Sequence, residues 1–227
     1  MYWDDDKQEK HIVSDDVMDM VYGIRCRSLP VDHAHALYQA LSTKLTWLKD
    51  EPTAGVHPIH VLEFGNGWMR PEAPNELLQL SRRIKLELRL PKHRIQEAEA
   101  LVGQTLDVAG NELQIIKART RPLTTITTIF SRYIVADSDD EGRFMDNIIA
   151  ELKVLGIRPE KMLPGRVHTI HTPDGQVAAR SLMVAGLRLE DSITLQQRGL
   201  GSHRHLGCGL FIPHKGISEV SPAQVMR

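Results

Sequence analysis

The order of apolar patterns in the first half of the chain constrains its fold more than any other sequence feature. Strand-like segments alternate with two helix-like segments, in the order strand, helix, strands, helix, strands. In residues 84–90 four apolar residues alternate with three charged ones, which predicts a half-buried strand. The expected strands are 18–29, 57–64, 77–80, 84–90, 105–108 and 112–117, and the expected helices are 33–48 and 91–102.

This order matches a βαββαβ unit, the ferredoxin-like arrangement that RNA-recognition modules also use. The second half begins similarly, with a strand at 126–136, a helix at 139–155, a strand pair at 166–171 and 176–187, and a final strand at 208–213. The sequence predicts an α+β protein of two tandem ferredoxin-like (RNA-recognition-like) domains, the second with a degenerate, short or missing second helix and a glycine-rich loop. The expected divisions are an acidic extension (1–16), two domains (17–120 and 121–216) and a tail (217–227).

Charge and hydropathy exclude membrane spanning but leave nucleic-acid binding open. No apolar run approaches the roughly 18–20 residues that a membrane helix needs. The N-terminus is acidic and lacks the apolar stretch of a signal peptide, so we expect a cytoplasmic protein with no membrane partner. The net charge is −1, yet the first twenty residues carry an excess of acids and the remainder is mildly basic. Phosphate binding depends on such local fields.

The glycine-rich segment 199–213 is the most specific candidate site. Its glycines let the backbone approach a ligand closely and point N–H groups at anionic oxygens. Its spacing is not that of a nucleotide P-loop, and no acid lies between Asp191 and Glu219. Either a phosphate cradle or a mobile turn before a strand fits this composition. The candidate RNA-binding residues are Arg198, Gly199, Gly201, His203, Arg204, His205, Gly207 and Lys215.

The second candidate site is the start of the first predicted helix, where Asp32 is the expected N-cap and His33 and His35 follow. A nearly neutral imidazole can take a proton from a ribose hydroxyl, and a helix N-terminus attracts phosphate. His35 lies about 200° around the helix from His33, so the two rings do not share one ligand. Tyr38 is a weaker candidate, and capping or surface roles remain open for both histidines.

A basic patch surrounds the strand that ends near residue 90. Its candidate RNA contacts are Arg82, Arg83 and Arg94, and a solvated surface is the alternative interpretation.

Metal binding is the main rival interpretation, because His33/His35 and His203/His205 form two HxH pairs. A helical HxH pair does not place both rings on one face, and no acid lies beside the second pair, so we expect no metal and no cofactor. The two cysteines, Cys26 and Cys208, are expected to be reduced and buried.

Three segments together resemble the repeat-processing endoribonucleases of the CRISPR-associated protein six family, closest to its myxan-type branch. The segments are LPVDHAHALYQAL, LSRRIKLELRLP and LQQRGLGSHRHLGCGLFIPHK, and the resemblance spans about residues 21–215. The glycine-rich signature is its most specific part. The resemblance implies two ferredoxin-like domains, which agrees with the order of elements above.

By this resemblance, the chain binds CRISPR repeat RNA and cuts the precursor transcript without metal. The 2′-hydroxyl attacks its own phosphate, which gives a 2′,3′-cyclic phosphate and a 5′-hydroxyl. The base or acid is implied to be His33, with His35 in reserve. The resemblance also implies that the enzyme stays on its guide RNA and joins other subunits of an effector complex. A non-catalytic repeat-RNA-binding subunit with the same fold, and a metal enzyme using the HxH pairs, are the alternatives.

Overall fold

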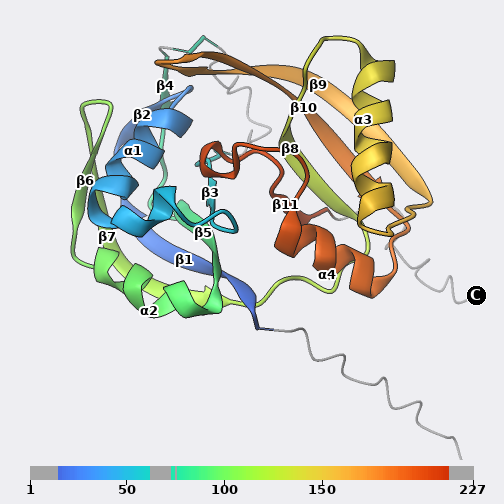
Figure 1. The fold of residues 1–227 in the computed structure, drawn as a ribbon. Helices are drawn as coiled ribbons and strands as arrows, with labels where there is room; N and C mark the ends of the chain where they lie inside the picture. The colour runs from blue at the N-terminus through green and yellow to red at the C-terminus, as the bar shows by residue number, and fades with distance from the viewer. Residues whose placement is uncertain (1–14, 62–72, 75, 215–227) are drawn as a thin grey trace, which may run out of the picture.

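Two antiparallel sheets, one in each half of the chain, form the frame of the protein (Figure 1). The computed structural model describes residues 15–61, 73–74 and 76–214. Residues 1–14 of the expected extension, residues 62–64 of an expected strand, Lys215 and the expected tail lie outside this described part. Among the described residues, no helix is long and apolar enough to cross a bilayer.

The N-terminal sheet has the strand order β3-β5-β1-β7-β6. Its central strand β1 (Val17–Arg25) runs antiparallel to β5 (Lys85–Pro91) on one side and to β7 (Asn111–Arg121) on the other. The edges are β3 (Gly55–His57) and β6 (Thr105–Val108). The order β3-β5-β1-β7 is that of a ferredoxin-like sheet, to which the hairpin strand β6 is added.

The expected first strand divides in two. After β1 the chain turns and forms β2 (Ser28–Pro30), which pairs with β4 (Leu77–Gln79) outside the main sheet. Strand β2 lies directly before α1 in the chain, with β4 beside it (Figure 1).

Helix α1 (Ala34–Lys44) packs on the N-terminal sheet through its leucine stripe, of which Leu37 and Leu41 are fully buried. The helix ends before residue 48 because Leu45 leaves the helical region, with φ −111° and ψ 80°. A short 3₁₀ turn, η1 (Thr46–Lys49), continues the chain. The second expected helix is broken into three short turns, η2 (Lys92–Arg94), α2 (Ile95–Ala98) and η3 (Glu99–Leu101).

The C-terminal sheet has the strand order β11-β8-β10-β9, which is the complete ferredoxin-like order. Its strands are β8 (Ile129–Val135), β9 (Lys161–Thr172), β10 (Gly175–Ala185) and β11 (Phe211–Pro213). The long β9–β10 hairpin reaches back over the N-terminal domain, toward β2 and the start of α1 (Figure 1). The predicted fold class, two ferredoxin-like domains, is therefore confirmed.

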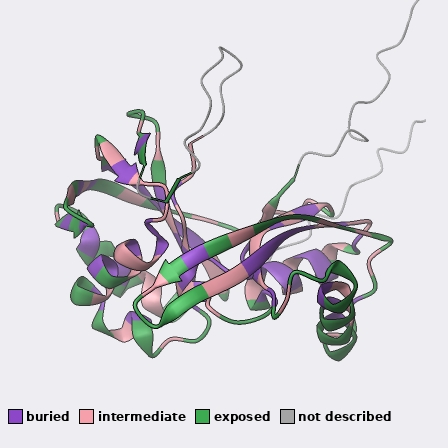
Figure 2. Ribbon diagram, turned by 90° about the horizontal axis from the view of Figure 1, so that it is seen from above, coloured by how far each residue is buried: buried purple, intermediate pink, exposed green. Residues whose placement is uncertain are grey.

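Helix α3 (Glu141–Val154) begins at Asp140, whose carboxylate accepts a hydrogen bond from the main-chain nitrogen of Arg143 at 2.7 Å. It buries Phe144, Ile148 and Leu152, while most of its other residues are exposed, as Figure 2 shows. Hydrophobic residues at this helical spacing explain why its position was predicted from sequence.

The expectation of a short or missing second helix in the C-terminal domain is corrected by α4 (Leu189–Arg198), a regular helix of ten residues. Its buried face includes Ser192 and Gln196, whose side chains bind main-chain carbonyls of Ile126 and Thr124. Because polar side chains occupy these buried positions, the apolar stripe that would have marked the helix in the sequence is interrupted.

A buried arginine joins the two domains. Arg89 on β5 is 1% exposed and pairs with Asp19 on β1 at 2.8 Å. Its Nη1 donates to the carbonyls of Gln196 and Phe211 in the C-terminal domain, at 3.1 and 2.6 Å. Burial alone would raise the pKa of Asp19, but the charge of Arg89 and hydrogen bonds from Arg89 and Arg121 hold that pKa well below its ordinary value.

Candidate functional site

The start of α1 and the glycine-rich segment, distant in sequence, lie side by side (Figure 1). The segment forms a 3₁₀ turn, η4 (Arg204–Leu206), against the helix. The rings of Tyr38 and His205 have centroids 4.5 Å apart. The structure thus brings together the two segments that the sequence singled out, as the proposed chemistry requires.

His33, the first candidate base, is buried and bonded through both ring nitrogens. Nε2 accepts a hydrogen bond from the main-chain nitrogen of Ile59 at 2.9 Å, so the proton is on Nδ1, which donates to the carbonyl of Pro30 at 2.8 Å. The side chain is 2% exposed. In this arrangement the lone pair of His33 is directed at a main-chain amide, and both ring nitrogens take part in holding the chain around the start of α1.

The expected N-cap role of Asp32 is also corrected. His33 occupies the N-cap position, without a side-chain cap. The Asp32 carboxylate instead accepts hydrogen bonds from the main-chain nitrogen and the Nδ1 of His171, at 2.8 and 2.6 Å. The Asp32 carboxylate therefore bonds to a residue 139 positions further along the chain and not to the first turn of α1.

His35, the reserve candidate, lies beside the glycine-rich segment. It is half-buried, and its Nε2 is shielded from solvent and has no hydrogen-bond partner among the described residues. An imidazole nitrogen left in this way is costly, because it has lost water without gaining a partner. His35 and Tyr38 are three residues apart and therefore share one face of α1.

Two histidines of the glycine-rich segment complete this group. The rings of His203 and His205 have centroids 5.7 Å apart. Burial, with the neighbouring His203 and His35, lowers the pKa of His205 below its ordinary value. Tyr38, His203 and His205 line a pocket of about 250 Å³. We call His35, Tyr38, His203 and His205 the helix–loop cluster.

The glycines of the segment serve close packing more than ligand approach. Gly207 has φ +89°, and a Cβ there would overlap Pro58 in the N-terminal domain. Gly199 has φ +69°, and a Cβ there would overlap the guanidinium of Arg204. Both residues are buried, whereas Gly201 is exposed. Gly201 is the exposed one of these three candidate glycines, but its main-chain N–H already donates to the carboxylate of Glu151 at 2.7 Å, so it is not open to a phosphate.

Arg204 is built into the protein and does not face solvent. Its guanidinium donates to the carbonyl of Arg198 at 2.6 Å and to those of Gln197 and Thr53, each at 3.1 Å. Burial, and then the charge of Arg89, lower its pKa to about 10, so it stays charged at neutral pH. Arg204 therefore caps the end of α4 and ties the glycine-rich segment to the N-terminal domain.

The remaining basic candidates lie in different places. Arg198 is exposed at the end of α4, and Arg82 and Arg83 are exposed in the turn before β5. Arg94 lies at the other end of β5, bound to Glu97 at 2.8 Å and to Glu51 at 3.4 Å. The predicted patch is thus divided, and Arg94 is neutralised by carboxylates.

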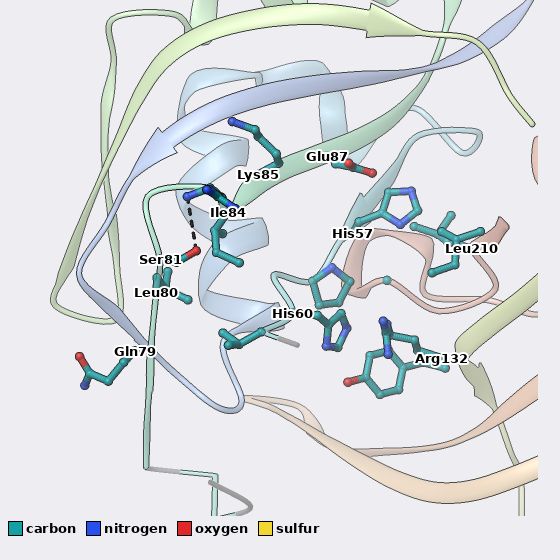
Figure 3. A pocket seen from close by; sticks show the side chains of 16 residues that line it. His57, His60, Gln79, Leu80, Ser81, Ile84, Lys85, Glu87, Arg132 and Leu210 are labelled. Atoms are coloured by element: carbon teal, nitrogen blue, oxygen red, sulfur yellow. Dashed lines mark hydrogen bonds between the residues drawn. The ribbon is translucent and has the colours of Figure 1, made fainter. Parts of the chain in front are cut away.

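A cleft of about 800 Å³ lies between the domains (Figure 3). Arg83 and Lys85 line it from the N-terminal domain, and Arg132 and Tyr133 line it from β8. His57 also lines the cleft, but burial and the charge of Arg89 lower its pKa to about 3, so it stays neutral. Arg132 and Tyr133 were not predicted as site residues, because no local motif in the sequence marks them.

Neither HxH pair belongs to a metal centre in the described structure. Residues 15–61, 73–74 and 76–214 contain no group of three His, Cys, Asp or Glu side chains arranged to hold a metal ion. Both cysteines are free, and burial raises the pKa of the Cys208 thiol to about 12, which makes it unreactive.

The chain is similar to known proteins over most of its length. The family model described as Cas6 Crispr matches residues 18–216. A protein named CRISPR-associated endonuclease Cas6, from Myxococcus xanthus strain DK1622, is 28% identical over 197 residues, which cover 86% of this chain and 81% of that protein.

Solved structures agree on the fold. One described as a Cas6-related gene product from Pyrococcus furiosus has a TM-score of 0.60 at 15% identity and covers 86% of this chain and 98% of its own. Another, named CRISPR associated protein Cas6, has a TM-score of 0.59 at 10% identity and covers 88% of this chain and 100% of its own. With its domains, its glycine-rich segment and a family match over most of its length, the chain belongs to the Cas6 family of CRISPR-associated proteins.

Proposed function

We propose that this protein is a metal-independent endoribonuclease that binds CRISPR repeat RNA and cuts the precursor transcript into guide RNAs. The observation that carries the proposal is the helix–loop cluster, in which an unpartnered imidazole nitrogen of His35 lies beside Tyr38 and His205. Family membership and the endonuclease name of the Myxococcus relative support the same reaction class.

The chemistry needs one proton acceptor and one proton donor at a phosphodiester. The His35 ring turns so that Nε2 reaches the bound strand and takes the proton of the 2′-hydroxyl, and the 2′-oxygen attacks the adjacent phosphorus. The bond from phosphorus to the 5′-oxygen breaks, and the Tyr38 hydroxyl gives its proton to that oxygen. Proton transfer from the His35 imidazolium restores Tyr38. The products are a 2′,3′-cyclic phosphate and a 5′-hydroxyl, with no water consumed.

The other candidate residues support this step without taking protons. His205 packs against the Tyr38 ring, and its lowered pKa keeps it uncharged, so that it orients Tyr38 by contact. Arg204 and Gly207 fix the segment that carries His205. Arg82, Arg83 and Arg198 are exposed cations that can contact phosphates of the bound strand.

The proposal extends to the fate of the product. We infer that the cleaved guide RNA stays bound, that turnover is close to single, and that the protein enters an effector complex in the cytoplasm with its guide. A protein-to-product ratio near one under excess substrate would support product retention.

The test is cleavage of a panel of repeat RNAs by the purified protein in excess chelator, with analysis of the product ends. The expected result is one cut per repeat, with a cyclic phosphate on one product and a 5′-hydroxyl on the other. A substrate with 2′-deoxyribose at the cut nucleotide should bind and stay intact, because it lacks the nucleophile.

Two results would contradict the proposal. Activity that is lost in chelator and restored by a divalent cation would indicate a metal mechanism. Tight binding of the repeat without cleavage under any condition would identify a non-catalytic RNA-binding subunit instead.

A further inference from the structure

A second pocket, of about 480 Å³, lies between the start of α1 and β9. It shares no lining residue with the pocket of the helix–loop cluster. Its walls come from both domains: Asp32 from the N-terminal domain, and Tyr133, Arg166, His168 and His171 from β8 and β9. The helix–loop cluster does not use these side chains.

Asp32 sets the hydrogen-bonding state of His171. Its Oδ2 accepts from Nδ1 of His171 at 2.6 Å and from the main-chain nitrogen of the same residue at 2.8 Å. With the proton held on Nδ1, Nε2 of the neutral ring can only accept a hydrogen bond. The His171 side chain is 45% exposed, so a ligand can reach this acceptor. Asp32 itself is only 13% exposed, which keeps the pair fixed.

Aromatic rings form another wall of the pocket. The rings of Tyr133 and His168 have centroids 5.1 Å apart and meet edge to face at 89°. The ring of His60 lies 6.0 Å from that of Tyr133. Such rings present faces on which a nucleobase can stack. Arg166 is exposed at the rim and adds a cation for a phosphate.

We propose that this pocket binds one unpaired ribonucleotide, with its base on Tyr133 and His168 and its 2′-hydroxyl donating to Nε2 of His171. The volume fits a single nucleotide, since small-ligand pockets begin at about 300 Å³, and does not admit a base pair. The acceptor at His171 makes the pocket specific for RNA, because deoxyribose has no hydroxyl to donate. The inference rests on the proposed function only in taking RNA as the ligand.

The test measures binding of single-stranded RNA at equilibrium, in a His35→Ala background so that no cutting interferes. A series of RNAs carries 2′-deoxyribose at one position each. At one position the substitution should weaken binding about 3- to 10-fold when His171 is present. In the His171→Ala protein the same substitution should have no further effect, because the pair of changes removes a single hydrogen bond.

Two further variants guard against a simple folding defect. Asp32→Asn keeps an oxygen acceptor for the main-chain nitrogen of His171, but no longer fixes its tautomer, and should reduce the 2′-deoxy effect. His93→Ala removes an exposed histidine bound to Glu51, neither of which lines the pocket, and should leave the effect unchanged. Thermal unfolding of each variant shows whether the fold is kept.

Each outcome has a distinct meaning. Additive losses at every position, or equal affinity for RNA and DNA of the same sequence, would overturn the proposed pocket. If the unsubstituted protein cuts no repeat RNA but the 2′-hydroxyl effect still depends on His171, the proposed function fails and the pocket stands. If cleavage occurs and no position depends on His171, the proposed function stands and the pocket fails.

Discussion

His33 and His35 lie two residues apart at the start of α1, yet their surroundings differ. On one side, His33 is buried and bonded to the main chain of Pro30 and Ile59. On the other, His35 is half-buried, and no hydrogen bond in the described structure satisfies its Nε2. A rotation of about 200° around the helix therefore separates an imidazole bonded to the main chain from the one that we propose as the base.

The largest expected effect concerns the side of His35. His35→Ala should lower the cleavage rate by about 10²–10⁴-fold, since it removes the proposed base, while the dissociation constant for repeat RNA changes little. The free energy of unfolding should change by less than about 1 kcal/mol. Single-turnover cleavage and an equilibrium binding titration measure both quantities. A His35→Ala protein that cuts at the parent rate would contradict this assignment. His214→Ala, which removes an exposed histidine after β11, is the matched control.

The next effect concerns the side of His33. His33→Ala leaves the carbonyl of Pro30 and the buried amide of Ile59 without a partner, which should cost about 2–4 kcal/mol of unfolding free energy. Urea unfolding measures this loss. His33→Gln, which can offer an amide oxygen to Ile59, should lose less. Full stability combined with loss of cleavage in His33→Ala would return the base to His33 and reverse our assignment.

A smaller effect is expected from a change that loosens the glycine-rich segment, which lies beside His35. Gly207→Ala should cost about 1–3 kcal/mol, because φ is +89° and the new Cβ overlaps Pro58, and cleavage should slow as His205 moves. Gly103→Ala is the matched control, with φ +83° and open space at the Cβ position. Unfolding free energies and cleavage rates that are equal in the two variants would show that the contact with Pro58 is unimportant.

The smallest expected effect is the dependence of the unfolding free energy on pH that His57 contributes. Burial, and then Arg89, lower the pKa of His57 to about 3 in the folded protein, whereas the unfolded value is near 6.5. Between pH 6.5 and 4.5 the unfolded chain binds the extra proton, so stability falls as the pH falls, by about 1.4 kcal/mol per unit for this group. In His57→Gln the slope measured by urea unfolding should be reduced by that amount. An unchanged slope would show that His57 is not held neutral.

The fold was largely predictable because regular apolar spacing marks most of its elements. The alternation in residues 84–90 predicted β5, and the spacing of Phe144, Ile148 and Leu152 predicted α3. Helix α4 was underestimated because Ser192 and Gln196 occupy its buried face. The hydrogen bonds of Ser192 and Gln196 to the carbonyls of Ile126 and Thr124 form only in the folded chain, so the sequence did not predict that these polar side chains would be buried.

The sequence predicted which two segments form the candidate site, but not which of their side chains are bonded within the protein. The sequence identified both the start of α1 and the glycine-rich segment, and their meeting is confirmed by the contact between Tyr38 and His205. Burial of Arg204 depends on the carbonyl of Thr53, 151 residues away, and the bonding of Asp32 depends on His171. Such long-range partners decide whether a cation or an acid is free for a ligand, and no local pattern carries that information.

The tie between Arg204 and Thr53 has a consequence for how the protein can be divided. Severing the chain between the domains would leave α1 with one fragment and the glycine-rich segment with the other, so neither fragment would hold the complete helix–loop cluster. Activity would return only on mixing, with a dependence on concentration set by how tightly the halves reassociate. The rate of the proposed cleavage would therefore also measure whether the two domains are joined.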